Sequence, residues 1–170
     1  MDFRLDSRVV GLRVVRWKCR PLILSYPPPS TLGLDYQAAR GVLRASGLGR
    51  ARMLNPKALP EVLGEVLTSG VRTAALVNRS GMLLGCAGDT ADATLAGAIG
   101  ANLWQCHERS EGAGALECML MECDDGRVAI KAVGSYIIIC CTDASVPFGQ
   151  LKAKTLALHD FLQGPLSQLS

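Results

Sequence analysis

Residues 116–142 read LECMLMECDDGRVAIKAVGSYIIICCT, and this stretch decides the fold class. It holds three segments of strand length, of which the middle one alternates apolar and polar residues, separated by the turn residues Asp124-Asp125-Gly126 and Gly134-Ser135. An Asp-Gly pair suits the positive φ angles of a tight hairpin turn. The stretch therefore predicts three antiparallel strands, at 116–123, 127–132 and 136–142. The last strand is apolar on both faces, which predicts a central position with helices on both sides.

Upstream of these strands the sequence predicts a further hairpin and two helices, and downstream one more helix. The first helix should begin at Asn55-Pro56, an N-cap followed by proline at the first helical position, and should end at Gly70. Its apolar residues have helical spacing: Leu59, Val62, Leu63, Val66 and Leu67. The other expected elements are strands at 71–78 and 82–87, a helix at 91–107 capped by Asp89-Thr90 and Asp92, and a helix at 148–162. The order α-β-β-α-β-β-β-α indicates an antiparallel α+β sheet with helices on both faces.

The charge of the chain is divided between two regions. Residues 1–52 hold ten Lys/Arg against three Asp/Glu, whereas residues 53–170 hold eight against twelve. An acidic domain is a poor candidate for nucleic-acid binding, which needs clustered basic groups. The basic region contains Pro27-Pro28-Pro29 and is expected to be a disordered extension. Two further interpretations stay open, namely a mitochondrial transit peptide or an upstream start ahead of a natural initiator at Met53.

Cysteines and apolar runs bear on the compartment. Six of the seven cysteines lie in residues 53–170, and there is no C-x-x-C pair and no secretory signal. We therefore expect free thiols in a reducing compartment rather than a disulfide framework. No apolar run approaches the roughly 18–20 residues that span a bilayer, and no lipidation motif is present. Membrane attachment would then depend on a partner.

The helix expected at 91–107 carries the clearest functional signal. No Asp, Glu, Lys or Arg lies between Asp92 and Glu108. A helix with one face in water normally carries charge on that face. Gly97 and Gly100 each cost about 1 kcal/mol of helix stability relative to Ala, which suggests that another backbone packs close. We therefore expect this helix to be covered twice, by its own sheet and by a partner subunit.

The strand at 116–123 is expected to share that interface. It is poor in charge, and an uncharged strand at a sheet edge tends to pair with another strand. Pairing at this edge would cover the strand and the neighbouring helix together. The expected heterodimer interface is Leu95, Ala96, Ile99, Gly100, Leu103, Trp104, Cys118, Met119, Leu120 and Met121.

Residues that could carry chemistry give weaker signals. Cys106-His107 and Cys118 lack the ligand spacing of a zinc site. Asp124-Asp125-Gly126 lacks the later ligands of a calcium loop, and a hairpin turn explains it. Cys140-Cys141 lies in the most apolar strand, where burial should raise the thiol pKa and make the pair inert. Lys152 and Lys154 are expected on the solvated face of the last helix. We predict no catalytic, cofactor or metal site.

Several short sequences occur in the order in which a known family has them. They are LNPKAL at 54–59, GDT at 88–90, NLW at 102–104, DGRVAI at 125–130, FGQLKAK at 148–154 and PL at 165–166. Together they resemble the roadblock/LC7 family, and within it the roadblock subunits of the Ragulator complex, the late endosomal and lysosomal adaptor for MAPK and mTOR signalling. The resemblance covers residues 53–170. Residues 1–52 have no counterpart in the family, and the segment 109–114 is shorter than the family's loop.

The resemblance implies a profilin-like fold, in which a five-stranded antiparallel sheet carries one helix on one face and two on the other. It implies a non-enzymatic scaffold that dimerises through the second helix and the third strand. The expected partners are a second roadblock-domain protein, which is the MAPK scaffold of the same complex, and a lipidated subunit that anchors the pair to late endosomes and lysosomes. The assembled complex would recruit Rag GTPases for mTORC1 signalling and contribute to guanine-nucleotide exchange on them.

Two other functions remain as alternatives. A dynein-associated roadblock light chain would have the same fold, and its complexes would contain dynein intermediate chain instead of lysosomal adaptors. A thiol- or metal-dependent enzyme would lose activity when Cys106 or Cys118 is changed to Ser. For the scaffold we predict that Leu103→Asp abolishes partner binding, because it places a charge in the expected interface.

Overall fold

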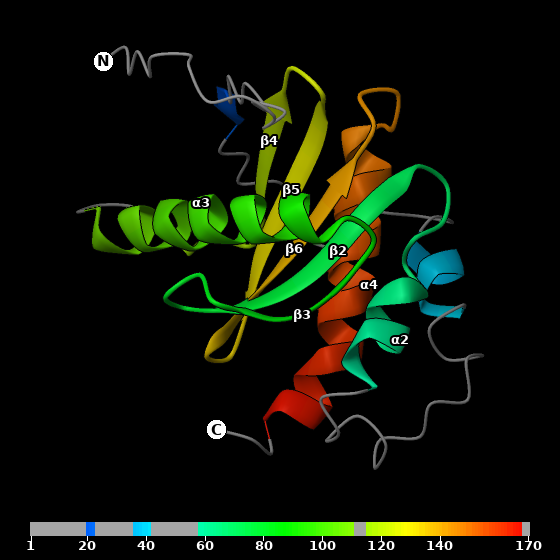
Figure 1. Cartoon of the computed structure of the whole chain (residues 1–170), viewed down its shortest axis with the longest axis horizontal. Coiled ribbons are helices and arrows are strands. Elements are labelled where there is room, and N and C mark those ends of the chain that lie inside the picture. The colour runs from blue at the N-terminus through cyan, green and yellow to red at the C-terminus, as the bar shows by residue number, and fades with distance from the viewer. Residues whose placement is uncertain (1–19, 23–35, 42–57, 111–114, 168–170) are drawn as a thin grey trace.

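The computed structural model describes residues 20–22, 36–41, 58–110 and 115–167. Its elements are β1 (Arg20–Leu22), α2 (Leu59–Gly64), β2 (Val71–Asn78), β3 (Leu83–Ala87), α3 (Thr90–Arg109), β4 (Met119–Cys123), β5 (Gly126–Val133), β6 (Tyr136–Thr142) and α4 (Phe148–Leu166). Residues 36–41 form a further short helical segment. From α2 onward the order is the predicted α-β-β-α-β-β-β-α (Figure 1).

The sheet is antiparallel, with the strand order β1-β4-β5-β6-β2-β3. Strands β2 to β6 are the five that the sequence predicts, and β1 adds a short strand at one edge. β6 lies inside the sheet between β5 and β2, and its residues from Ile137 to Thr142 are buried. The central position predicted from its two apolar faces is therefore confirmed.

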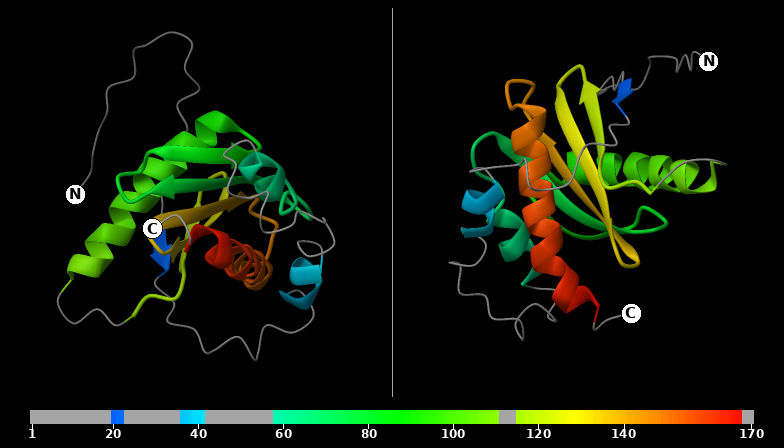
Figure 2. Two further views of the ribbon diagram at one scale, coloured as in Figure 1. Left: turned by 90° about the horizontal axis from the view of Figure 1, so that it is seen from below. Right: turned by 180° about the vertical axis from the view of Figure 1, so that it is seen from behind.

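The helices divide between the two faces of the sheet. α3 lies on one face, and α2 and α4 lie on the other (Figures 1 and 2). The core beneath α2 and α4 includes Leu76, Ile138 and Leu158, and the core beneath α3 includes Val77 and Ile139. Consecutive strand residues thus alternate between the two cores, as the geometry of a strand requires. Burial of apolar side chains on both faces stabilises the sheet.

The first helix of the domain differs from its prediction. Its expected start at Asn55-Pro56 lies outside the described residues. The sequence predicts an end at Gly70, whereas α2 ends at Gly64, because the following backbone hydrogen bonds reach back three residues instead of four. Ser69 and Gly70 then adopt φ angles of 51° and 84°, which turn the chain into β2. Val66 still joins the core, from this turn rather than from a helix.

The two edges of the sheet differ in regularity. β3 pairs with β2 in a register that shifts between Leu76 and Val77, so that Leu84 has no partner residue in the ladder. Such a β-bulge bends and twists the strand that contains it. At the other edge, β4 forms an unbroken ladder with β5, and its outer side pairs with β1. The sheet therefore has one irregular edge and one regular edge.

Two described elements, β1 and the helical segment 36–41, lie within the region for which the sequence predicts disorder. Tyr36 and Ala39 pack against the core beneath α4, and the Tyr36 hydroxyl donates a hydrogen bond to Asp160 of that helix. Residues 1–19, 23–35 and 42–52, and the domain boundary expected at residue 53, lie outside the described residues.

Lys152 and Lys154 contradict their prediction, because both are buried, with 4% and 7% of their surface exposed. Lys152 Nζ lies 2.9 Å from Glu117 Oε2. Lys154 Nζ donates to Thr68 Oγ1 over 3.0 Å and also to the Thr68 carbonyl oxygen. Burial lowers the pKa of Lys154. The two lysines are tolerated because their charged groups find polar partners inside the fold.

Candidate partner-binding surface

The start of α3 is fixed by its cap and by the preceding glycine. The Asp89 side chain accepts hydrogen bonds from the backbone N–H groups of Ala91, at 2.8 Å, and Asp92, at 3.1 Å, which confirms its predicted capping role. Gly88 has a φ of +91°, and a Cβ there would lie 2.1 Å from the Arg72 carbonyl oxygen. Glycine is therefore required where the chain leaves β3 for the helix.

The glycines inside α3 let the helix lie close to its own sheet. A Cβ on Gly97 would lie 2.8 Å from Val77 Cγ1, and one on Gly100 would lie 3.1 Å from Ile130 Cδ1 and 3.2 Å from Ile139 Cδ1. The close backbone predicted beside these glycines is found within the chain and only at Gly97, where a Cβ would lie 3.6 Å from the Gly81 carbonyl oxygen. The other buried residues of α3 share the sheet side with them: Ala93, Ala96, Ala101 and Trp104.

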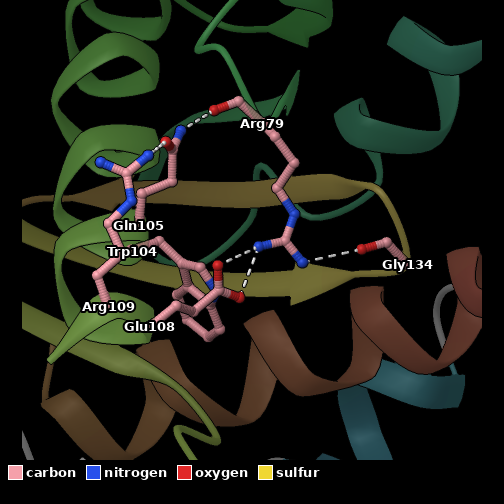
Figure 3. A network of polar contacts seen from close by, with 6 residues as sticks. All are labelled: Arg79, Trp104, Gln105, Glu108, Arg109 and Gly134. Carbon is pink, nitrogen blue, oxygen red and sulfur yellow. Dashed lines mark hydrogen bonds and ion pairs between the residues drawn. The ribbon is translucent and has the colours of Figure 1, made fainter. Parts of the chain in front are cut away.

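A polar network holds the C-terminal part of α3 in place (Figure 3). Arg79, in the turn after β2, donates to both carboxylate oxygens of Glu108 at 2.6 and 2.8 Å, and to the Gly134 carbonyl oxygen at 3.1 Å. Trp104 Nε1 donates to Glu108 Oε1 at 2.8 Å. Gln105 Nε2 donates to the Arg79 carbonyl oxygen. One arginine thus joins α3 to two turns of the sheet.

The network lowers the pKa of Glu108 through hydrogen bonds to that carboxylate. The hydrogen bonds from Arg79 are the main cause that lowers the pKa of Glu108, and the Trp104 indole contributes in the same direction. Glu108 is accordingly ionised at neutral pH and stays bonded to the arginine. Sequence reasoning missed this network, because Arg79 and Glu108 are far apart in the chain and have no recognisable spacing. The only signal was Glu108 as the first charge after the uncharged stretch.

The side of α3 that faces away from the sheet is uncharged. We call Leu95, Ala98, Ile99, Asn102, Leu103 and Cys106 the α3 outer face. Leu95 is 38% exposed, three of the others are exposed, and Ile99 and Leu103 are half-buried. Among the described residues, Leu95 is one of three large apolar side chains classed as exposed, with Met82 and Leu84. This face is available for a protein partner.

The structure divides the predicted interface residues into two groups. Leu95, Ile99 and Leu103 lie on the α3 outer face. The other residues are buried within the chain: Ala96, Gly100, Trp104, Cys118, Met119, Leu120 and Met121. In β4 the side chains alternate between the two cores, so its contribution to an interface would come from the backbone at its outer edge.

Leu103 and Trp104 share their core with Met119 and Met121 of β4. The C-terminal half of α3 therefore lies over the same face of the sheet as these β4 side chains, and Figure 1 shows α3 crossing β4.

The buried thiols have the character predicted for them. Burial raises the pKa of Cys140 to about 11 and the pKa values of Cys118 and Cys141 to about 12. Such thiols are protonated and poorly nucleophilic near neutral pH. Within the described ranges no three His, Cys, Asp or Glu side chains are placed to hold a metal ion. No helix in the described part of the chain is both long and apolar enough to cross a membrane.

Comparison with known proteins places the chain in a family. Residues 60–143 match the Roadblock/LC7 domain. The chain is 31% identical over 122 residues to the Ragulator complex protein LAMTOR2 homolog of Caenorhabditis elegans, a match that covers 69% of this chain and 97% of that protein. Among solved structures, Myxococcus xanthus MglB has a TM-score of 0.60 at 17% identity, covering 68% of this chain and 92% of MglB.

A Roadblock/LC7 domain from Streptomyces avermitilis has a TM-score of 0.55 at 16% identity, covering 64% of this chain and 95% of that domain. At such identities the solved structures show the fold alone. The family match over residues 60–143 and the 31% identity to the nematode protein over 69% of this chain go further than the fold. This chain is a member of the roadblock/LC7 family.

Proposed function

We propose that this protein is a non-enzymatic scaffold subunit of a Ragulator-type complex and that it forms a heterodimer with a second roadblock-domain protein. The observation that carries the proposal is the α3 outer face, of which four of the six residues are exposed and none is charged. A helix face that remains in water normally carries charged side chains. An uncharged face of this kind is typical of a surface that a partner covers.

The proposed partners are suggested by the nematode protein to which this chain is similar. The nematode protein is named as a Ragulator complex protein, and this chain matches nearly its whole length. We propose that the heterodimer is held on late endosomes and lysosomes by a lipidated subunit. There it would recruit Rag GTPases for mTORC1 signalling, scaffold the MAPK cascade and contribute to nucleotide exchange on the GTPases. In such an assembly this chain supplies binding surfaces and no catalytic group.

The test is size-exclusion chromatography with light scattering on the full chain, alone and co-expressed with the MAPK scaffold roadblock subunit. We expect a stable one-to-one heterodimer. A homodimer that ignores this partner would contradict the proposal and would favour the dynein-associated light chain. Isolation of the endogenous complex separates the same two functions, since it would contain either lysosomal adaptors or dynein intermediate chain.

A matched pair of substitutions locates the surface. Leu95, on the α3 outer face, and Leu84, on β3 at the edge of the sheet away from β4, are 38% and 41% exposed. Leu95→Asp should abolish heterodimer formation, whereas Leu84→Asp adds the same charge elsewhere and should preserve it. Leu103→Asp should also prevent binding, but Leu103 is half-buried and its loss disturbs the core as well. Equal behaviour of the two variants at Leu84 and Leu95 would sink the interface assignment.

A further inference from the structure

β1 occupies the sheet edge at which the proposed partner would pair. Its three residues are antiparallel to β4, with Arg20 opposite Glu122, Pro21 opposite Met121 and Leu22 opposite Leu120. Figures 1 and 2 show the short strand beside β4, at the end of the sheet away from β3. A strand edge offers one set of backbone N–H and C=O groups, so only one strand can pair with it at a time.

The sequence of β1 suits a weak and replaceable strand. In an antiparallel ladder the hydrogen-bonded pairs alternate with pairs that are not bonded. Pro21 has no N–H and can therefore stand in a non-bonded pair, while the residues on either side of it carry the bonds. A strand of three residues, with proline at its centre, forms few bonds with β4. A longer strand from another protein could replace it.

A second contact anchors the chain that follows β1. The helical segment 36–41 lies on α4, where the Tyr36 hydroxyl donates to Asp160. Burial and the bond to Asp160 raise the pKa of Tyr36, so that the hydroxyl keeps its proton at neutral pH. Thirteen residues separate Leu22 from Tyr36 in the sequence. Attachment through such a short length of chain makes the pairing of β1 with β4 an intramolecular event with a high effective concentration.

We infer that β1 is a built-in competitor of the partner subunit, because it covers the β4 edge in the free chain and must leave before a second roadblock-domain protein can pair there. The inference rests on the proposed function. If β1 covers the edge in nine-tenths of the molecules, the apparent affinity for the partner falls about tenfold, in proportion to the open fraction. Residues 20–22 would thus set a threshold for assembly.

Two full-length variants at Leu22 test whether β1 covers the β4 edge, one that weakens β1 and one that serves as its control. Leu22→Pro removes the N–H of Leu22 and should weaken β1, whereas Leu22→Val keeps that N–H. We measure hydrogen exchange in the β4 peptide and partner affinity by titration calorimetry. Leu22→Pro should speed exchange in β4 and raise the affinity on the order of tenfold. Leu22→Val should resemble the unmodified chain in both measurements.

A second variant closes the edge. Arg20→Cys combined with Glu122→Cys places thiols at opposed positions of the ladder, where the Cα separation of neighbouring strands suits a disulfide. Cys19 is next to position 20 and Cys123 is next to position 122, so either native thiol could form the disulfide instead. Peptide mapping therefore has to show that the disulfide joins positions 20 and 122. The oxidised protein should lose partner binding at least tenfold, and reduction should restore it. Each single-cysteine variant serves as the control.

The outcomes distinguish this inference from the proposed function. Unchanged exchange in Leu22→Pro, or full partner binding by the cross-linked protein, would overturn the competitor role of β1 while the heterodimer stands. If neither the unmodified chain nor Leu22→Pro binds the partner, although exchange in β4 is faster, then the proposed heterodimer fails and the competition with it. Faster exchange together with tighter binding supports both.

Discussion

The two long helices lie on opposite faces of one sheet, and their charge and exposure are inverted. α4 carries Lys152 and Lys154, yet every residue from Leu151 to Leu158 is buried. α3 has no charged residue between Asp92 and Glu108, yet its outer face is open to solvent. In α4 the charges are bonded within the chain, to Glu117 and Thr68. Charge in a helix therefore indicates exposure only when no internal partner is present.

The contrast separates a helix whose lysines have partners within the chain from a helix that leaves an uncharged face in solvent. α4 has its core on the sheet and its lysines in internal contacts. α3 has a buried sheet side and an outer face on which Leu95, Ala98, Asn102 and Cys106 are exposed. The experiments below test the contrast, beginning with the largest expected effect.

Thiol reactivity should differ most between the buried cysteines and Cys106. Cys140 and Cys118, in the α4 core, have pKa values raised by burial to about 11 and about 12, whereas Cys106 is exposed on the α3 outer face. At pH 8 the thiolate population of a group with a pKa near 12 is on the order of a thousandfold below that of an ordinary cysteine. Mass spectrometry after brief alkylation should show Cys106 modified and the buried thiols intact. Heterodimer formation should protect Cys106, and unaltered labelling in the complex would argue against contact there.

Trp104→Ala should sharpen the difference between the two sides of α3. The indole is buried on the sheet side and bonded to Glu108, and loss of a buried tryptophan typically costs about 3–5 kcal/mol of unfolding free energy. Asn102→Ala changes an exposed residue of the same helix and should stay within about 0.5 kcal/mol of the unmodified protein. Urea denaturation measures both. Similar losses would mean that the α3 outer face is also part of the folded core.

The strand pattern was predictable from sequence, because turn residues and apolar patterns within a short stretch of sequence identify each strand. The Asp-Gly turn at 125–126 and the apolar run at 137–141 fixed β5 and β6 without knowledge of the rest. The orientation of α3 was harder to predict, because its two sides have similar hydrophobicity. Gly97 and Gly100 mark the sheet side only once Val77 and Ile139 are known to press against them.

The buried lysines were unpredictable for a different reason. Glu117 is separated from Lys152 by 35 positions, so no local spacing reveals the ion pair. β1 is too short to give a periodic signal, and its position depends on the free edge of β4. The partner surface on α3 therefore stays a prediction from sequence, whereas the strand that pairs with the β4 edge became visible only in three dimensions.

Lys152→Met would test whether the α4 charges are internal contacts. The substitution keeps the aliphatic stem and leaves Glu117 without its partner, so we expect a loss of about 1–2 kcal/mol, less than for a fully buried pair because Glu117 is partly hydrated. A double-mutant cycle with Glu117→Gln in thermal denaturation isolates the pair. Coupling near zero would class it with ordinary surface ion pairs.

The smallest effect is expected at Arg79. Its hydrogen bonds lower the pKa of Glu108, so the ionised carboxylate stabilises the fold above its ordinary pKa of about 4.3, and this contribution is lost as pH falls through the lower folded value. Arg79→Ala should cost about 0.5 kcal/mol at neutral pH, because both groups are well exposed. The difference from the unmodified protein should shrink below about pH 4. NMR titration should show the Glu108 pKa rising in Arg79→Ala, and an unchanged value would contradict the assigned cause.

The bulge at Leu84 has a consequence for how these sheets can assemble. A sheet with two regular edges could add neighbours on both sides and polymerise into a fibre. Here the β2–β3 register breaks at Leu84, so the β3 edge offers no even row of backbone groups to an incoming strand. In the proposed heterodimer, strand pairing would then be limited to the β4 side. The irregular β3 strand would leave the pair closed, with no second regular edge from which a chain of sheets could extend.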